Sequence, residues 1–130
     1  MTDEAKAASL PVFKEYRGVK IGMTADEVRN MLADSLKSKS EQEDLFVFSG
    51  GETAIVYYDA AGKVTAVSVD YPARSAKAPS AEDVLGEEVK VRDDGSMYSL
   101  VRYPSAGYWV AYSRTSGDSA LVTVTIQKMN

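Results

Sequence analysis

Cysteine and histidine are both absent from the 130 residues of this chain, and tryptophan occurs once. Without cysteine the chain has no disulfide, no thiol nucleophile and no thiolate metal ligand. Without histidine it lacks both the side chain that most often acts as a general base near neutral pH and the imidazole ligand of many metal sites. We therefore expect a protein that is not an enzyme, with no catalytic residues, no metal site and no cofactor.

Long apolar runs are also missing, since no stretch reaches the ~18 to 20 residues that a membrane-spanning helix needs. Residues 1–9 lack the basic start and apolar core of a signal peptide, and their polar, alanine-rich composition predicts a disordered leader. With 45% hydrophobic content, residues 10–130 are expected to form a single domain. The formal charge is −4, and Lys and Arg are scattered, which disfavours a nucleic-acid partner.

Two short segments have the pattern of a helix start. Thr24 is followed three positions later by Glu27, and Ser80 by Asp83, and each pair can form a capping box in which side chains satisfy the free amides of the first turn. Apolar side chains spaced for one helix face predict a helix over residues 25–36. These side chains are Val28, Met31, Leu32 and Leu36.

β-branched and aromatic runs separated by Gly, Pro and Asp predict the strands. The charged residues 37–44 are expected to be a solvated loop. The expected strands cover residues 45–49, 53–59, 63–71, 88–92, 97–103, 108–114 and 120–128. Their short connections favour antiparallel meanders.

The spacing of these signals suggests an internal repeat. The two helix starts, Thr24 and Ser80, lie 80 − 24 = 56 positions apart, and two pairs of later strands are offset by 55 and 57 positions. We therefore predict an α+β fold of two tandem repeats, residues 16–72 and 79–130. Each repeat is a short helix plus an antiparallel β-meander, with the helices packed on one face of the sheet. The expected core comprises Val28, Met31, Leu32, Val67, Val69, Val84, Leu85, Val122, Val124 and Ile126.

Aromatic residues cluster between positions 98 and 112. Such a cluster can fill the core, or it can form a binding surface, because Tyr and Trp are enriched at protein interfaces. Strand alternation puts Tyr108 and Tyr112 on one face and Trp109 on the other. We expect Trp109 to be buried and the tyrosine pair to be exposed, because a tyrosine hydroxyl tolerates water. The candidate partner-binding residues are Tyr98, Arg102, Tyr108, Tyr112 and Arg114.

Residues 21–32, with the sequence IGMTADEVRNML, resemble the Gly-Met-Thr-x-x-x-Val-x-x-x-Leu signature of the SmpA/OmlA family, small outer-membrane lipoproteins of the barrel assembly machinery. Residues 56–64 are similar to that family's strand, Asp and Gly-Lys-Val turn, so the resemblance spans about residues 16–71. A tandem copy of this unit resembles the β-lactamase-inhibitor-protein-like fold, whose paired meanders form a curved sheet that grips a partner protein.

The resemblance implies a non-catalytic protein-binding module of the cell envelope that uses an open β-sheet face. It would be located in the periplasm if a signal peptide was removed, and in the cytoplasm otherwise. The alternatives are a cytosolic adaptor or chaperone-like binding protein, and an inhibitor of a partner enzyme. The expected partner is another protein, with a homo-oligomer as a further possibility.

Overall fold

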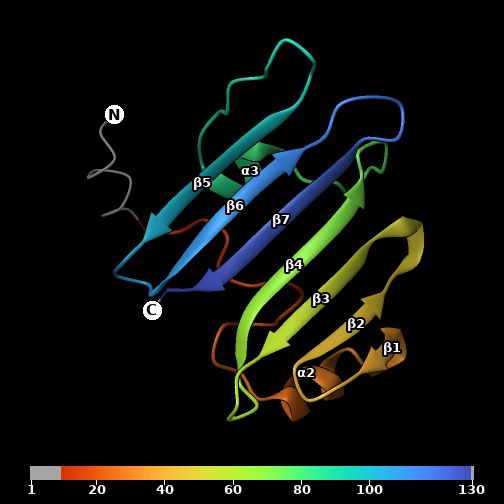
Figure 1. Cartoon of the computed structure of the whole chain (residues 1–130), viewed down its shortest axis with the longest axis vertical. Coiled ribbons are helices and arrows are strands. Elements are labelled where there is room, and N and C mark those ends of the chain that lie inside the picture. Colours follow the sequence, from red (N-terminus) through yellow and green to blue (C-terminus); the bar gives the residue numbers. More distant parts are fainter. Residues whose placement is uncertain (1–9, 130) are drawn as a thin grey trace.

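Residues 10–129 are described in the computed structural model, and their seven strands form one antiparallel sheet (Figure 1). The strand order across the sheet is β1-β2-β3-β4-β7-β6-β5. The strands are β1 Leu36–Lys39, β2 Glu43–Val47, β3 Thr53–Tyr58, β4 Val64–Pro72, β5 Met97–Tyr103, β6 Tyr108–Arg114 and β7 Leu121–Lys128. The expected disordered leader, residues 1–9, lies outside the described residues.

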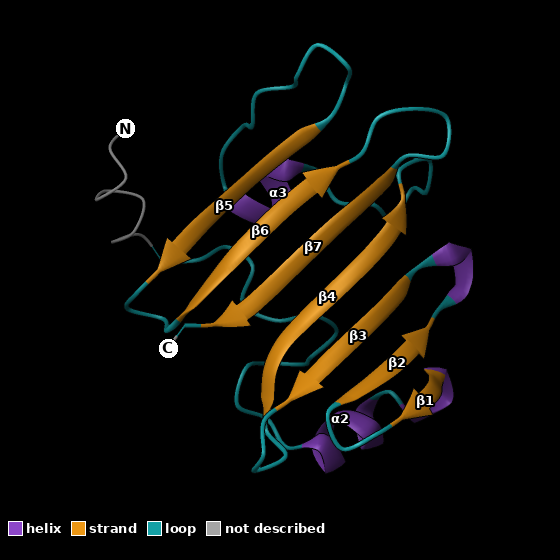
Figure 2. Ribbon diagram, in the orientation of Figure 1, coloured by secondary structure: helices purple, strands orange, loops and turns teal. Residues whose placement is uncertain are grey.

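Helix makes up a small part of the chain, as Figure 2 shows. The α-helices are α2 (Ala25–Met31) and α3 (Ala81–Leu85), and single 3-10 turns occur at η1 (Ala33–Ser35) and η2 (Ser49–Gly51). Both predicted capping boxes are confirmed, at the start of α2 and at the start of α3. Local sequence therefore determines where each helix begins.

The prediction of two tandem helix-plus-meander repeats is wrong. Strands β4 and β7 pair through seven residue pairs, from Ala66 opposite Gln127 to Pro72 opposite Leu121, and this pairing joins all strands into one sheet. The helices have only seven and five residues. Evenly spaced caps and turns indicate only where the chain reverses direction. Which strands pair depends on apolar contacts between residues far apart in the sequence, and the spacing does not reveal these contacts.

Three local predictions also differ from the structure. The helix expected over residues 25–36 ends at Met31, and β1 begins at Leu36 inside the stretch expected to be helix and loop. A four-residue edge strand tolerates this charged sequence because its side chains face water. No strand forms over residues 88–92, which have no regular structure, and a turn follows them in which the Arg92 amide donates to the Ser96 carbonyl.

Both helices pack on the same side of the sheet, which we call the covered face. One row of cross-strand partners on this face is Asp44, Val56, Val67, Ile126, Val110 and Val101, and all six are buried. Arg29 of α2 binds Asp44, and the Tyr112 hydroxyl donates to the Pro79 carbonyl just before α3. Figure 1 shows α3 behind β5 and β6. The hydrophobic core lies between the covered face and the segments packed on it.

The expected core residues are buried, except for two on α2 and its C-terminal end. Met31 is 45% exposed, and Leu32 is only partly buried against the core. Val28 is the one buried side chain of the seven-residue helix α2. The apolar spacing identified the buried Val28, but its continuation to Leu36 does not form a helix, because Leu36 belongs to β1.

Candidate functional site

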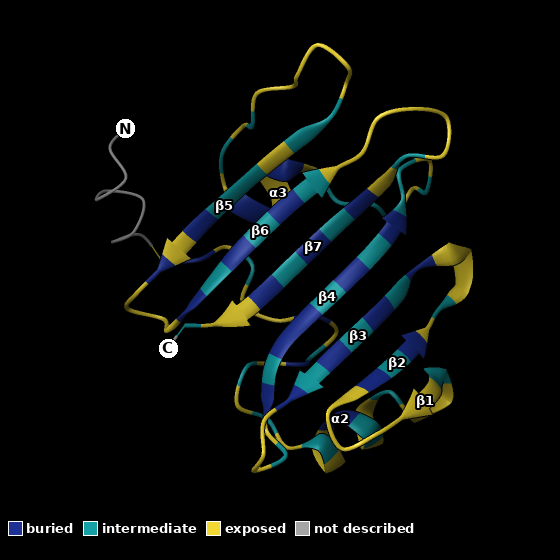
Figure 3. Cartoon of the chain, in the orientation of Figure 1, coloured by how far each residue is buried: buried dark blue, intermediate teal, exposed yellow. Residues whose placement is uncertain are grey.

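The candidate functional site is the other side of the sheet, which we call the open face. Neither helix packs on it, and its side chains are mostly half-buried or exposed (Figure 3). Strand register arranges it in three cross-strand rows. The rows are Leu45-Ile55-Ser68-Thr125-Ala111-Leu100, Glu43-Tyr57-Ala66-Gln127-Trp109-Arg102 and Val47-Thr53-Asp70-Thr123-Ser113-Tyr98.

Hydroxyl groups occupy the centre of the open face, where β4 and β7 meet. The Ser68 and Thr125 hydroxyl oxygens are 3.3 Å apart, and the Thr123 hydroxyl donates to Asp70 Oδ1 at 2.6 Å. An open depression of about 580 Å³ lies beside them. Its lining residues are Tyr57, Asp59, Thr65, Ala66, Ser68, Thr125, Gln127 and Lys128. The centre is therefore polar, with its hydroxyls already engaged across the strands.

Apolar side chains flank this polar centre on both sides. Leu45 and Ile55 are direct partners on β2 and β3, while Trp109 and Leu100 lie on β6 and β5. Trp109, the single tryptophan of the sequence, is half-buried on the open face. The combination of aromatic, aliphatic and hydrogen-bonding groups is typical of protein interfaces.

The prediction that Tyr108 and Tyr112 are exposed and Trp109 is buried is wrong. Tyr108 is 8% exposed and Tyr112 is 2% exposed, and both lie on the covered face. Their hydroxyls are hydrogen-bonded within the protein, since Tyr112 donates to the Pro79 carbonyl at 3.0 Å and Tyr108 to the Phe13 carbonyl at 3.3 Å. A tyrosine whose hydroxyl is satisfied inside the protein can be buried as readily as a tryptophan.

The other candidate residues divide between the two faces. Tyr98, which is 52% exposed, and Arg102 lie on the open face, whereas Arg114 shares the strand parity of the buried Tyr112. Arg114 lines a cavity beside the start of α3 with Tyr112 and Val122. The structure therefore brings together only Tyr98 and Arg102 from the predicted set, and it adds Trp109 and Ile55.

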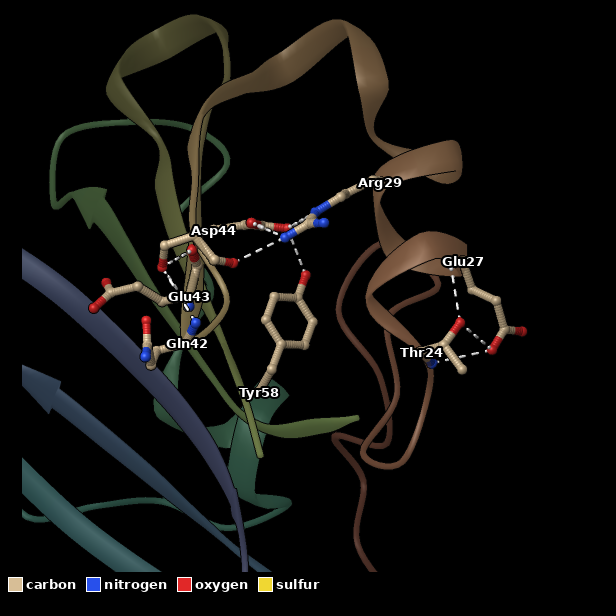
Figure 4. Close-up of polar contacts among 8 residues, drawn as sticks. Thr24, Glu27, Arg29, Gln42, Glu43, Asp44 and Tyr58 are labelled. Carbon is tan, nitrogen blue, oxygen red and sulfur yellow. Dashed lines mark hydrogen bonds and ion pairs between the residues drawn. The ribbon is translucent and has the colours of Figure 1, made fainter. Parts of the chain in front are cut away.

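A buried ion pair joins α2 to the sheet, and Figure 4 shows its geometry. Asp44 is fully buried and accepts two hydrogen bonds from Arg29, from Nε at 2.8 Å and from Nη2 at 2.9 Å. The Tyr58 hydroxyl donates to Asp44 Oδ2 at 2.7 Å. Burial of Tyr58 and this hydrogen bond raise the pKa of its hydroxyl well above the usual range. Sequence reasoning missed this cluster because it placed Asp44 in a solvated loop.

A second buried carboxylate, Glu52, is held by the same kinds of partner. Arg17 donates from Nε at 3.0 Å and from Nη2 at 3.1 Å, and the Tyr16 hydroxyl donates to Oε2. The Arg17 guanidinium also lies 3.9 Å from the centre of the Phe48 ring. Burial alone would raise the pKa of Glu52, but the hydrogen bonds from Arg17 and Tyr16 outweigh it and lower that pKa. Because both carboxylates bind Arg and Tyr within the fold, we interpret the two clusters as structural.

Among residues 10–129, no helix is long and apolar enough to cross a membrane. Within the same residues, no three metal-ligating side chains gather in one place. No protein-family model, curated protein or solved structure matches this chain. The resemblance of residues 21–32 to the SmpA/OmlA signature stays a prediction.

Proposed function

We propose that this chain is a non-catalytic protein-binding module whose open face contacts the partner. The observation that carries this proposal is a face six strands wide on which Trp109, Tyr57 and Ile55 are left without a covering helix. A monomer gains nothing in stability by keeping large apolar side chains partly in water, so such a surface favours an interaction. The two buried carboxylates support the non-catalytic part, since their oxygens bind Arg and Tyr inside the fold.

The chemistry of the open face specifies the kind of partner. Apolar flanks on either side of a polar centre match a folded protein surface that presents aliphatic or aromatic side chains with a few hydrogen-bonding groups between them. Arg102 lies at the β5 side of the face and Glu43 at the β2 side. The matching partner surface therefore has a carboxylate near Arg102 and a cation near Glu43.

The resemblance to the SmpA/OmlA signature supports placing this binding function in the cell envelope. We expect the native gene to encode an export signal ahead of this sequence, and the mature protein to fractionate with the envelope. A native product that stays in the cytosol would contradict the envelope placement and favour the adaptor or chaperone-like alternative.

The binding proposal is tested with a partner identified by crosslinking in the native cell and then purified. Trp109 reports the interaction directly, because its fluorescence is the only tryptophan signal of this chain and it lies on the open face. Ile55→Asp puts a charge at the apolar flank and should weaken binding by about 30-fold or more, the loss of about 2 kcal/mol that defines a central contact.

Met31→Asp is the matched control, since Met31 is 45% exposed on α2 and far from the open face. This variant should bind as the wild type does. Unchanged binding by Ile55→Asp would refute the open face as the contact surface, and so would a loss confined to Met31→Asp. A hydrolytic activity abolished by one Ser or Asp substitution would refute the non-catalytic assignment.

A further inference from the structure

The two edges of the sheet differ in how they are protected. Edge strand β1 has only four residues, carries Lys37 and Lys39, and has a register shift between Leu36 and Ser38. Short length, lysines and bulges all hinder pairing with another strand. Edge strand β5 has seven residues in unbroken register with β6 and contains no lysine, proline or glycine. No other described strand pairs with its outer side.

We propose that β5 pairs antiparallel with β5 of a second copy of this chain, with the twofold axis at Leu100. A strand that pairs with its own copy about a twofold axis is necessarily antiparallel. Centring on Leu100 places Met97 opposite Tyr103 and Ser99 opposite Val101. It also places Arg102 of each copy opposite Tyr98 of the other, on the open face.

This register is self-complementary in chemistry. Tyr98 is 52% exposed, and Arg102 is exposed with no ion pair to any described residue. An arginine guanidinium stacks favourably on a tyrosine ring, and the twofold axis provides two such contacts. Each copy therefore supplies both halves of the contact, a condition that a symmetric dimer interface must meet.

Charge favours the same register. A cavity of about 580 Å³ lies between Tyr98 and the loop that leads from α3 to β5. Its lining is strongly charged and includes Glu88, Asp93, Lys90 and Arg92. Arg102 of the second copy reaches Tyr98 beside this cavity, where Glu88 and Asp93 are carboxylates that its guanidinium can approach.

The pairing would extend the sheet from one copy into the next and place the two open faces side by side. It shares Arg102 with the open face, but it pairs the outer edge of β5, whereas the Ile55→Asp test of the proposed function addresses the opposite flank on β3, so the two proposals can fail separately. Only one strand and one loop from each copy take part, so the interface is small and the dimer should depend on concentration.

Sedimentation velocity over a range of concentrations tests the dimer. The wild type should shift from monomer to dimer as concentration rises. Arg102→Glu should raise the dimer dissociation constant by about tenfold or more, because it removes the stacking on Tyr98 and brings a carboxylate beside Glu88 and Asp93. Arg74→Glu is the control, since Arg74 is an exposed residue in the loop after β4 and the charge change is identical. A wild type that stays monomeric overturns the proposal, as does an Arg102→Glu variant that dimerises like Arg74→Glu.

Disulfide trapping tests the register, because the chain contains no cysteine of its own. Residues directly opposite in an antiparallel pair have Cα atoms about 4.5 to 5.5 Å apart, within the range that a disulfide spans. Leu100→Cys should therefore form a crosslinked dimer under mild oxidation. Ser113→Cys, on the same face one strand inward, should not. Absence of the Leu100→Cys crosslink, or equal crosslinking of both variants, overturns this register.

Discussion

At the scale of single residues, two buried carboxylates attach the N-terminal region to the sheet. Asp44 and Glu52 are the buried charged side chains among the described residues, and each binds one arginine and one tyrosine. A buried charge is tolerated only when it is paired and hydrogen-bonded. The same chemistry thus stabilises α2 through Arg29 and the segment before it through Arg17.

Asp44→Asn should lower the free energy of unfolding by about 3 kcal/mol, because Arg29 loses its carboxylate partner. This value is the low end of the cost of breaking a buried pair, since 26% of the Arg29 side chain remains in water. Urea denaturation measures this difference. The neighbouring Glu43→Gln is the control, since Glu43 is exposed, and it should change stability by no more than about 0.5 kcal/mol. Similar effects of the two substitutions would contradict the importance of the Asp44 cluster.

Glu52 should make the stability of the folded protein depend on pH in the acidic range. Its pKa is lower in the folded protein than the usual value of 4.5, so it contributes stability above that pH and loses the contribution as pH falls through the folded pKa. The difference in unfolding free energy between the wild type and Glu52→Gln should therefore be constant above about pH 5 and shrink below it. Denaturation series at several pH values measure this difference, and a gap that widens in acid would contradict the assignment.

At the scale of elements, α2 packs on the core through one buried side chain, and not through a continuous row of apolar side chains. Val28 is fully buried, whereas Met31, one turn later, is 45% exposed. The helix begins after the capping box at Thr24. It does not continue to Leu36, because Leu36–Lys39 pairs with β2 as strand β1. Tertiary pairing thus overrides the apolar periodicity that continues to Leu36.

Val28→Ala should cost about 2 kcal/mol of unfolding free energy, from lost burial plus the cavity that remains. Met31→Ala should change stability by no more than about 0.5 kcal/mol, because the side chain is largely in water and alanine is a good helix former. Thermal or chemical denaturation of both variants measures the contrast. Equal losses would mean that Met31 packs more closely than its exposure indicates.

At the scale of the whole molecule, the pairing of β4 with β7 makes the sheet continuous. Val67 and Val69 on β4 lie opposite Ile126 and Val124 on β7, and all four are buried. Neither half of the chain can separate from the other without exposing this apolar seam to water. We therefore expect the sheet to unfold as one cooperative unit.

A destabilising substitution in the first half of the chain should therefore lower the unfolding midpoint measured by a probe in the second half. Asp44→Asn, on β2, should lower the denaturation midpoint of Trp109 fluorescence, on β6, as much as it lowers the midpoint of far-ultraviolet circular dichroism. Two separate transitions would contradict this prediction, as would a Trp109 midpoint that does not move.

Local chemistry in the sequence determined much of the secondary structure. The capping boxes at Thr24 and Ser80 begin their helices as predicted, and the strands expected over residues 97–103 and 108–114 have those bounds in the structure. Caps, turns and strand alternation depend on neighbouring residues, which is why a single sequence reveals them.

Only the tertiary structure decided which strands pair and which way each face points. Alternation correctly separated Tyr112 from Trp109, but it could not tell which of them faces the core, because that depends on the distant Pro79 carbonyl that accepts the Tyr112 hydroxyl. The burial of Asp44 likewise depends on Arg29 and Tyr58, which are far from it in sequence. Contacts between residues distant in the chain cannot be read from local pattern, and they set the open face on which the proposed function rests.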